Sequence, residues 1–160
     1  MYCTTLAIER KESYALKIDR QEGGMKGSIK MRGIVEQFIE VINAHNVSRL
    51  LELMTADHRF IDAVGNQVTG LTTLETAWQG YFAWMPDYAI TAETWFEQGN
   101  QVAFFGIAQG TYAVQGQLLP ENHWKLPAAW KATMHDSKIA VWQVYCDTKP
   151  VFDLMARNAP

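Results

Sequence analysis

The sequence predicts an α+β fold in which helices cover one face of a curved antiparallel sheet. In its first half, apolar residues recur at helical spacing, and only one segment there alternates like a strand. From residue 88 onwards, long alternating segments are joined by short turns, which is typical of β-hairpins. The expected order is therefore three helices with one strand among them, followed by four long strands.

Three helices are expected from the periodicity of the first half. The first covers residues 33–46 and the second residues 47–54, with Asn46 as the N-cap of the second. The third covers residues 71–85, where Thr72 and Glu75 have the spacing of a capping box and Pro86-Asp87 ends the helix.

The strands are expected between turn signals. Residues 57–64, "DHRFIDAV", alternate like a strand, and two later hairpins turn at residues 97–100 and 136–137. The segment 114–127, "VQGQLLPENHWKLP", is too polar and too rich in Pro and Gly to be regular throughout, so His123 and Trp124 are expected in a long loop. That loop, residues 113–126, is either a lid or a plain surface loop. Residues 150–157 are expected to form a short helix that begins with Pro150.

Length and composition indicate one domain of 160 residues, with residues 1–30 as an N-terminal extension and residues 31–160 as the domain. The segment "QEGGMKGS" resembles a linker, and a solvated, flexible tail is expected before it. Residues 1–32 carry seven Lys and Arg against four Asp and Glu, whereas the rest carries seven against thirteen. An acidic folded part argues against nucleic acid as a partner.

The sequence shows no apolar run long enough to span a membrane and no continuous apolar core of a signal peptide, so a cytoplasmic protein is expected. Cys3 and Cys146 lie far apart and fit no metal spacing, which favours two free thiols and no metal site. Six Trp, six Tyr and seven Phe are enough to fill a large core or to line a ligand pocket.

Asp62 is the most unusual residue, because it follows Phe60 and Ile61 at the end of a short apolar strand. An ionised carboxylate is costly to bury unless it is paired or functional. Asp62 either points to water at the strand end, pairs with Arg59 or His58, or points into a cavity. Phe60 and Asp62 share one strand face because side chains alternate along a strand.

Roughly residues 33–157 resemble the nuclear transport factor 2-like (NTF2-like) superfamily, and within it the polyketide cyclase-like (SnoaL-like) and ketosteroid isomerase-like proteins. The resemblance lies in the leading amphipathic helix and in the segments "LLELMTADHRFIDAVGNQVTG", "GNQVAFFGIAQGTY" and "DSKIAVWQVYCDTKPVF". It implies a cone-shaped, curved antiparallel sheet wrapped around about three N-terminal helices, an α+β barrel of the cystatin-like kind. It also implies an apolar pocket in the cone, no cofactor, and a homodimer formed through the outer face of the sheet.

The same resemblance implies which residues form the site. Asp62 falls where ketosteroid isomerase-like members carry the carboxylate that moves a proton. The positions of their oxyanion-binding tyrosine and acid fall at Phe38 and near Trp130, which cannot donate as those groups do. The side chains expected to face the ligand are Phe38, Phe60, Trp78, Tyr81, Phe82, Phe105, Ile107, Gln109, Trp130, Ala132, Met134, Trp142, Val144 and Cys146.

Three functions are consistent with this pattern. The first is an enzyme of the isomerase or cyclase type that acts on a small, apolar, cyclic molecule, with Asp62 as the base. The second is a binding protein that uses the same pocket without catalysis. The third is a dimeric module for protein association.

Overall fold

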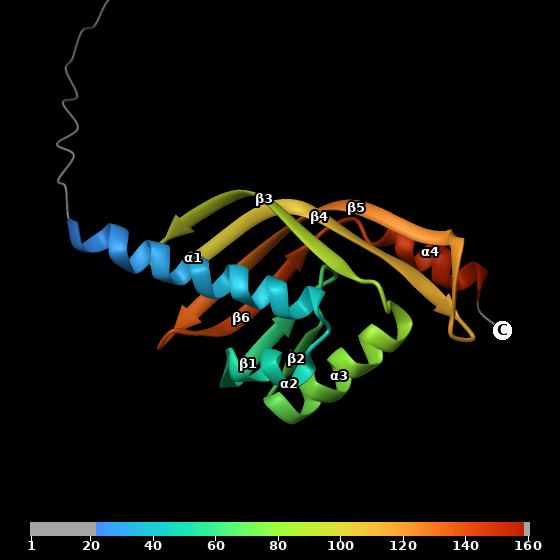
Figure 1. Cartoon of the computed structure of the whole chain (residues 1–160), viewed down its shortest axis with the longest axis horizontal. Coiled ribbons are helices and arrows are strands. Elements are labelled where there is room, and N and C mark those ends of the chain that lie inside the picture. The colour runs from blue at the N-terminus through green and yellow to red at the C-terminus, as the bar shows by residue number, and fades with distance from the viewer. Residues whose placement is uncertain (1–21, 159–160) are drawn as a thin grey trace, which may run out of the picture.

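The computed structural model describes residues 22–158, which form four helices and one mixed sheet of six strands (Figure 1). The helices are α1 (Glu22–Asn43), α2 (Val47–Glu52), α3 (Leu71–Trp84) and α4 (Lys149–Arg157). The strands are β1 (Met54–Ile61), β2 (Gln67–Thr69), β3 (Ala89–Gln98), β4 (Gln101–Val114), β5 (Gln117–His135) and β6 (Lys138–Tyr145). The predicted α+β class is confirmed.

The strand order is β2-β1-β6-β5-β4-β3. Strands β3 to β6 form consecutive antiparallel hairpins, whereas β1 pairs with β6 in parallel. The parallel pair arises because β1 and β6 are neighbours in the sheet but are separated in the chain by α3 and the hairpins, so no tight turn links them. The sheet curves around α1, and α2 and α3 lie next to β1 (Figure 1).

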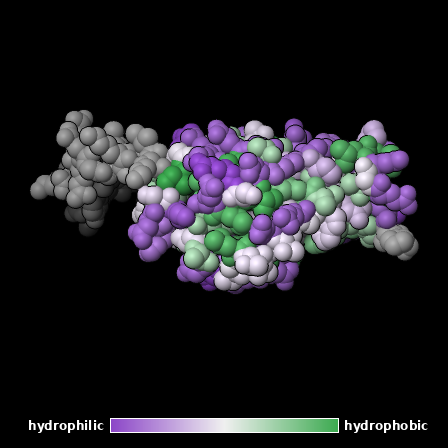
Figure 2. All heavy atoms as spheres, turned by 60° about the horizontal axis from the view of Figure 1, so that its bottom comes forward, coloured by the Kyte–Doolittle hydropathy of each residue, from purple (hydrophilic) through white to green (hydrophobic). Residues whose placement is uncertain are grey.

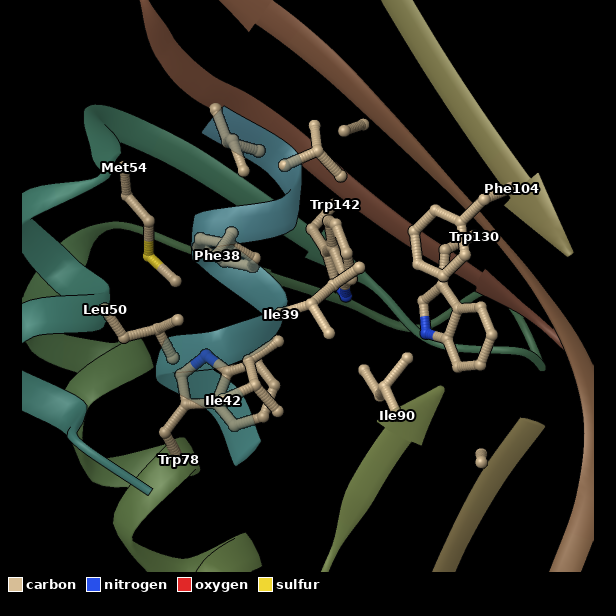
Figure 3. Packing of buried hydrophobic residues seen from close by; sticks show 14 of the residues in the cluster. Phe38, Ile39, Ile42, Leu50, Met54, Trp78, Ile90, Phe104, Trp130 and Trp142 are labelled. Atoms are coloured by element: carbon tan, nitrogen blue, oxygen red, sulfur yellow. The ribbon is translucent and has the colours of Figure 1, made fainter. Parts of the chain in front are cut away.

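The core lies between α1 and the concave face of the sheet. Phe38 and Ile42 of α1 are fully buried; Phe38 lies beside Trp142, and Ile42 lies on the side of Leu50 and Trp78 (Figure 3). The Phe38 and Trp142 rings are 4.8 Å apart, and Phe104 stacks on Trp130, also at 4.8 Å. Aromatic side chains thus fill this half of the cone with tightly packed rings.

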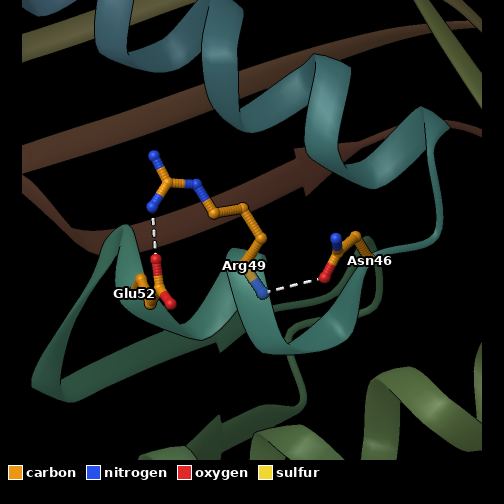
Figure 4. Close-up of polar contacts among 3 residues, drawn as sticks. All are labelled: Asn46, Arg49 and Glu52. Carbon is orange, nitrogen blue, oxygen red and sulfur yellow. Dashed lines mark hydrogen bonds and ion pairs between the residues drawn. The ribbon is translucent and has the colours of Figure 1, made fainter.

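Asn46 caps α2 as the sequence predicts. Its side-chain oxygen accepts the backbone N–H of Arg49 at 3.0 Å, and Arg49 forms an ion pair with Glu52 (Figure 4). The predicted capping box of α3 is wrong, because α3 begins at Leu71 with Gly70 as the N-cap and without a side-chain capping bond. Gly70 has a φ of 86°, a backbone conformation that glycine adopts without strain.

Two segments are more regular than expected. The predicted linker lies in helix α1 from Glu22 onwards, since a helix that is already formed gains a hydrogen bond with each added residue. The expected loop 113–126 is instead the end of a long hairpin, in which β5 begins at Gln117 and pairs with β4 as far as Val114. Gln115 and Gly116 both have positive φ and make the tight turn.

The short helix expected at residues 150–157 is confirmed as α4, with a proline in its first turn. Residues 1–21 lie outside the described residues, and the boundary of the domain at residue 31 stays a prediction. In the part of the chain that the structure describes, no helix has both the length and the apolar character needed to cross a membrane.

Candidate functional site

A pocket of about 580 Å³ opens beside α3 and is the candidate functional site. Its walls come from β1, β2, α3, the segment before β3, strands β4 to β6, and α4. The wall residues are Phe60, Asp62, Ala63, Val68, Leu74, Thr76, Ala77, Trp78, Gly80, Tyr81, Trp84, Met85, Tyr88, Ala108, Trp124, Leu126, Trp142, Val144, Cys146, Thr148, Val151, Phe152 and Met155. Most of these side chains are apolar or aromatic, as is usual for a small-molecule site.

The mouth of the pocket is marked by Trp84 at the end of α3 and Phe152 of α4, which are 55% and 54% exposed. Figure 2 shows apolar atoms gathered in the centre of the face turned forward, and again at the end of the molecule where α4 and the β4–β5 turn lie. Helix α4 is fixed by Asn158, whose amide donates to Asn122 at 3.0 Å and to the Leu154 carbonyl at 2.9 Å. The mouth is therefore framed by the end of α3 and by α4, which Asn158 anchors to β5.

Asp62 lies in the pocket wall, as Phe60 does, and is half-buried. Its carboxylate accepts three hydrogen bonds from the turn that follows β1. Oδ1 accepts the backbone N–H groups of Val64 and Asn66 at 3.0 and 2.8 Å, and Oδ2 accepts the Asn66 amide at 2.8 Å. Asp62 therefore holds this turn together, and Oδ2 retains a lone pair for a further donor.

Two tyrosines stand side by side in the pocket wall. Tyr81 lies in the last turn of α3 and Tyr88 directly precedes β3, and their rings meet edge to face with centroids 5.0 Å apart. Burial raises the pKa of Tyr81, and the nearby Cys146 thiol adds to this rise. Burial also raises the pKa of Tyr88, with Tyr81 and Cys146 as smaller causes. Both phenols therefore stay protonated near neutral pH.

Trp124 closes the pocket on the side of β5. Its indole N–H lies 3.3 Å from the Met85 sulfur, and its ring lies 6.1 Å from that of Tyr88. A Cβ atom at Gly110 would lie 3.4 Å from both the Trp124 ring and the Tyr88 Cα. The absence of a side chain at Gly110 thus lets Tyr88 and Trp124 approach each other across β4.

His58, which the sequence offers as a partner of Asp62, is fully buried in the core. Its Nδ1 lies 2.7 Å from the Ile139 carbonyl, whereas Nε2 has no partner among the described residues. Burial lowers the pKa of His58, while the bond to Ile139 and the charge of Asp57 oppose this effect. His58 is therefore a neutral core residue, and it neither pairs with Asp62 nor reaches the pocket.

The structure brings seven of the fifteen predicted site residues together in the pocket wall: Phe60, Asp62, Trp78, Tyr81, Trp142, Val144 and Cys146. Five others are buried in the core without lining the pocket: Phe38, Phe82, Trp130, Ala132 and Met134. Their rings and methyl groups fill the half of the cone that lies under α1. The cone is thus solid at one end and hollow at the other.

The predicted inward face of β4 is wrong for Phe105, Ile107 and Gln109. The buried residues of β4 alternate as Val102, Phe104, Gly106, Ala108 and Gly110, and Phe105 is 54% exposed on the opposite face. Choosing the other alternation moves every side chain of a strand across the sheet. Two buried glycines made the true inner face look less apolar than the outer one.

Sequence reasoning did not place Tyr88, Trp84 or the side chains of α4 in the pocket wall, and it offered Trp124 only as part of a lid or a surface loop. Tyr88 lies between α3 and β3, directly after the Pro86-Asp87 pair that follows the helix. Trp124 lies in a segment that was expected to be an irregular loop, so its side chain was not assigned to a strand face. In α4, Val151, Phe152 and Met155 reach the pocket at helical spacing, which the sequence pattern could have indicated.

Asp62 is the one charged side chain among the wall residues, all of which belong to the described part of the chain. Within residues 22–158, no group of three or more His, Cys, Asp and Glu side chains is placed to hold a metal ion. Burial raises the pKa of the Cys146 thiol, with Asp147 adding to the rise, so this sulfur is a poor nucleophile. The arrangement can enclose an apolar molecule and offer it phenol O–H groups and one carboxylate.

The family model described as "SnoaL-like domain" matches residues 35–142. None of the curated protein sequences compared with this chain matches it. Solved structures with the same fold include a protein from Shewanella putrefaciens assigned to the SnoaL-like polyketide cyclases, with 13% identity and a TM-score of 0.69 over 80% of this chain and 97% of that chain.

Two further structures with this fold contain small molecules. A Catenulispora acidiphila protein with a ketosteroid isomerase-like fold, in complex with trimethylamine, is 20% identical over 70% of this chain and 83% of that one, with a TM-score of 0.62. TerC, co-crystallised with polyporic acid, is 15% identical over 79% of this chain and 98% of that one, with a TM-score of 0.66. Identities this low support the fold alone.

Proposed function

The chain belongs to the SnoaL-like domain family, and we propose from that premise that its pocket binds a small, uncharged, largely apolar cyclic molecule. The observation that carries this proposal is the 580 Å³ aromatic pocket beside α3, whose volume lies in the range of about 300–1,000 Å³ usual for small-molecule sites. Flat rings fit between aromatic walls because edge-to-face and offset contacts stabilise them.

Charge restricts the ligand further. No Lys or Arg belongs to the described wall of the pocket, so a bound anion would lose its hydration without gaining a counter-charge. It would also meet the negative charge of Asp62. A neutral molecule avoids both penalties.

The test uses 2-acetylnaphthalene as a neutral probe and 2-naphthoate as its anionic counterpart, with binding followed by quenching of tryptophan fluorescence. The neutral probe is expected to bind at least tenfold more tightly than the anion. Val144→Phe fills the pocket from β6 and is expected to weaken binding of the neutral probe at least tenfold. Val141→Phe, on the opposite face of the same strand, is the matched control and should bind as the wild type does. Equal affinity in both variants would contradict the proposal.

Proton transfer by Asp62 is a second candidate function, favoured by the lone pair that remains on Oδ2 at the pocket wall. A carboxylate so placed could remove a proton next to a carbonyl group. The test is deuterium incorporation into the methyl group of 2-acetylnaphthalene in D2O, followed by NMR. Exchange faster than in buffer is expected for the wild type and should be lost in Asp62→Asn, whereas exchange no faster than in buffer would argue for binding alone.

The proposal also includes a dimer, in which two copies of the chain associate through the outer face of the sheet. Phe96 and Phe105 are exposed there with ring centroids 5.5 Å apart, and Tyr145 shares a row with Phe105 across β5. Exposed aromatic groups of this kind are enriched in the centres of protein interfaces. The proposed dimer therefore forms through the outer face of the sheet and leaves the pocket of each copy open.

A further inference from the structure

Tyr81 and Tyr88 carry hydroxyl groups that the fold leaves without a protein partner. Within the described residues, neither O–H makes a hydrogen bond to another side chain or to the backbone, although both rings lie in the wall of the pocket. Neither phenol oxygen is among the fully buried polar atoms without a partner, so both are reachable from the pocket. Tyrosine hydroxyls in largely apolar surroundings usually find a partner, and a ligand inside the pocket can supply one.

The two rings are held in place by the protein itself. The Tyr81 ring lies at 89° to that of Trp78, with centroids 6.1 Å apart. The Tyr88 backbone is fixed by its carbonyl, which lies 2.8 Å from Nε2 of His45, and by its N–H, which donates to the Met85 carbonyl at 3.1 Å. Donors fixed in advance lose little entropy when a ligand binds.

The other hydrogen-bond donors of the wall differ from the two phenols in kind and in position. The Trp124 indole N–H points at the Met85 sulfur, the Thr76 hydroxyl donates to the Thr72 carbonyl at 3.4 Å, and the Cys146 thiol is only a weak donor. The indole N–H groups of Trp78, Trp84 and Trp142 and the Thr148 hydroxyl also belong to the wall. Among the wall residues, Tyr81 and Tyr88 are the two phenols, and their rings lie next to each other.

We infer that the hydroxyl groups of Tyr81 and Tyr88 together bind the carbonyl oxygen of the ligand, so that the ligands of this pocket are aryl or cyclic ketones. A carbonyl oxygen has two lone pairs and can accept from both phenols. The apolar body of the ketone then extends towards Trp84 and Phe152 at the mouth. This inference rests on the proposed function, because it assigns one end of the same pocket.

The test compares 2-acetylnaphthalene with 2-ethylnaphthalene, which has a similar shape but lacks the oxygen. The ratio of the two affinities is expected to favour the ketone in the wild type and to fall about five- to tenfold in Tyr81→Phe and in Tyr88→Phe, which remove only the hydroxyl. Tyr145→Phe, on the outer face of the sheet, is the matched control and should keep the wild-type ratio.

Infrared spectroscopy of the ketone labelled with carbon-13 at its carbonyl supplies a second readout. The carbonyl band is expected to shift to lower wavenumber on binding and to move back in each of the two pocket variants. A shift that is unchanged in both variants, or an affinity ratio that they leave unaltered, overturns this inference while leaving the pocket as a binding site. If neither compound binds to the wild type, the proposed function itself is overturned.

Discussion

Asn66 holds the carboxylate of Asp62 from two sides, with its backbone N–H 2.8 Å from Oδ1 and its side-chain amide 2.8 Å from Oδ2. A residue at the rim of a pocket thus also fastens the turn between β1 and β2. The two roles of Asp62, structural and chemical, can be separated by substitution.

Asp62→Ala removes the three side-chain hydrogen bonds of the turn and is expected to lower the free energy of unfolding by about 1–2 kcal/mol. Asp62→Asn keeps one oxygen and should cost less, and the Asp62→Asn/Asn66→Asp double variant should recover part of that loss because donor and acceptor exchange places. Urea denaturation measures these differences. Asp57→Ala, at an exposed site of the same strand, is the control, and an equal loss there would show that the turn contributes nothing.

Buried His58 makes stability depend on pH. Because its pKa is lower in the folded protein than the usual value of 6.5, the unfolded chain binds the proton first. Stability is therefore fully present above pH 6.5 and should fall as the pH drops from there towards the folded pKa, by up to about 1.4 kcal/mol per pH unit.

Urea denaturation between pH 5 and 8 checks this expectation. His58→Asn keeps a donor for the Ile139 carbonyl but cannot be protonated, so this variant should be less stable at pH 8 and should lose less stability on acidification. His135→Asn alters an exposed histidine and should keep the wild-type slope. The same slope in His58→Asn would show that other groups cause the acid effect.

Gly106 allows β3 and β4 to come close at a bulge in their pairing. A Cβ atom there would lie 2.0 Å from the Thr91 carbonyl oxygen, which belongs to the backbone and cannot turn away. Gly106→Ala is expected to destabilise the fold by at least about 2 kcal/mol.

The control for this substitution is Gly33→Ala in helix α1, where a Cβ atom meets nothing within 4 Å. It should raise stability by about 0.5–1 kcal/mol because alanine favours the helix more than glycine does. Thermal unfolding of both variants measures the contrast, and a similar change in the two would mean that the close approach at Gly106 is readily relieved.

The outer face of the sheet provides a prediction about assembly. Phe105→Lys places a charge in the centre of the exposed aromatic group that Phe96 and Tyr145 share, and it is expected to convert a dimer into a monomer. Sedimentation velocity measures the change. Leu118→Lys, at the β4–β5 turn, is the control and should leave the association unchanged. A wild type that sediments as a monomer at all concentrations would exclude this interface.

The sequence by itself determined the α+β class, the Asn46 cap, the short helix α4 and the strand that places Phe60 and Asp62 on one face. These features depend on local periodicity and on side chains that bond within a few residues, so a single segment contains the information. The family resemblance added the cone shape of the curved sheet to these local features.

Only the tertiary structure decided which face of β4 is buried, where His58 lies and which half of the cone is hollow. In β4, Gly106 and Gly110 occupy the inner face because Thr91, Tyr88 and Trp124 approach there, and such contacts between distant segments leave no periodic signal. The pairing of Tyr81 with Tyr88, and the contribution of α4 to the mouth, arise in the same way. Cavities form where packing between elements is incomplete, and no single segment specifies the space that the others leave empty.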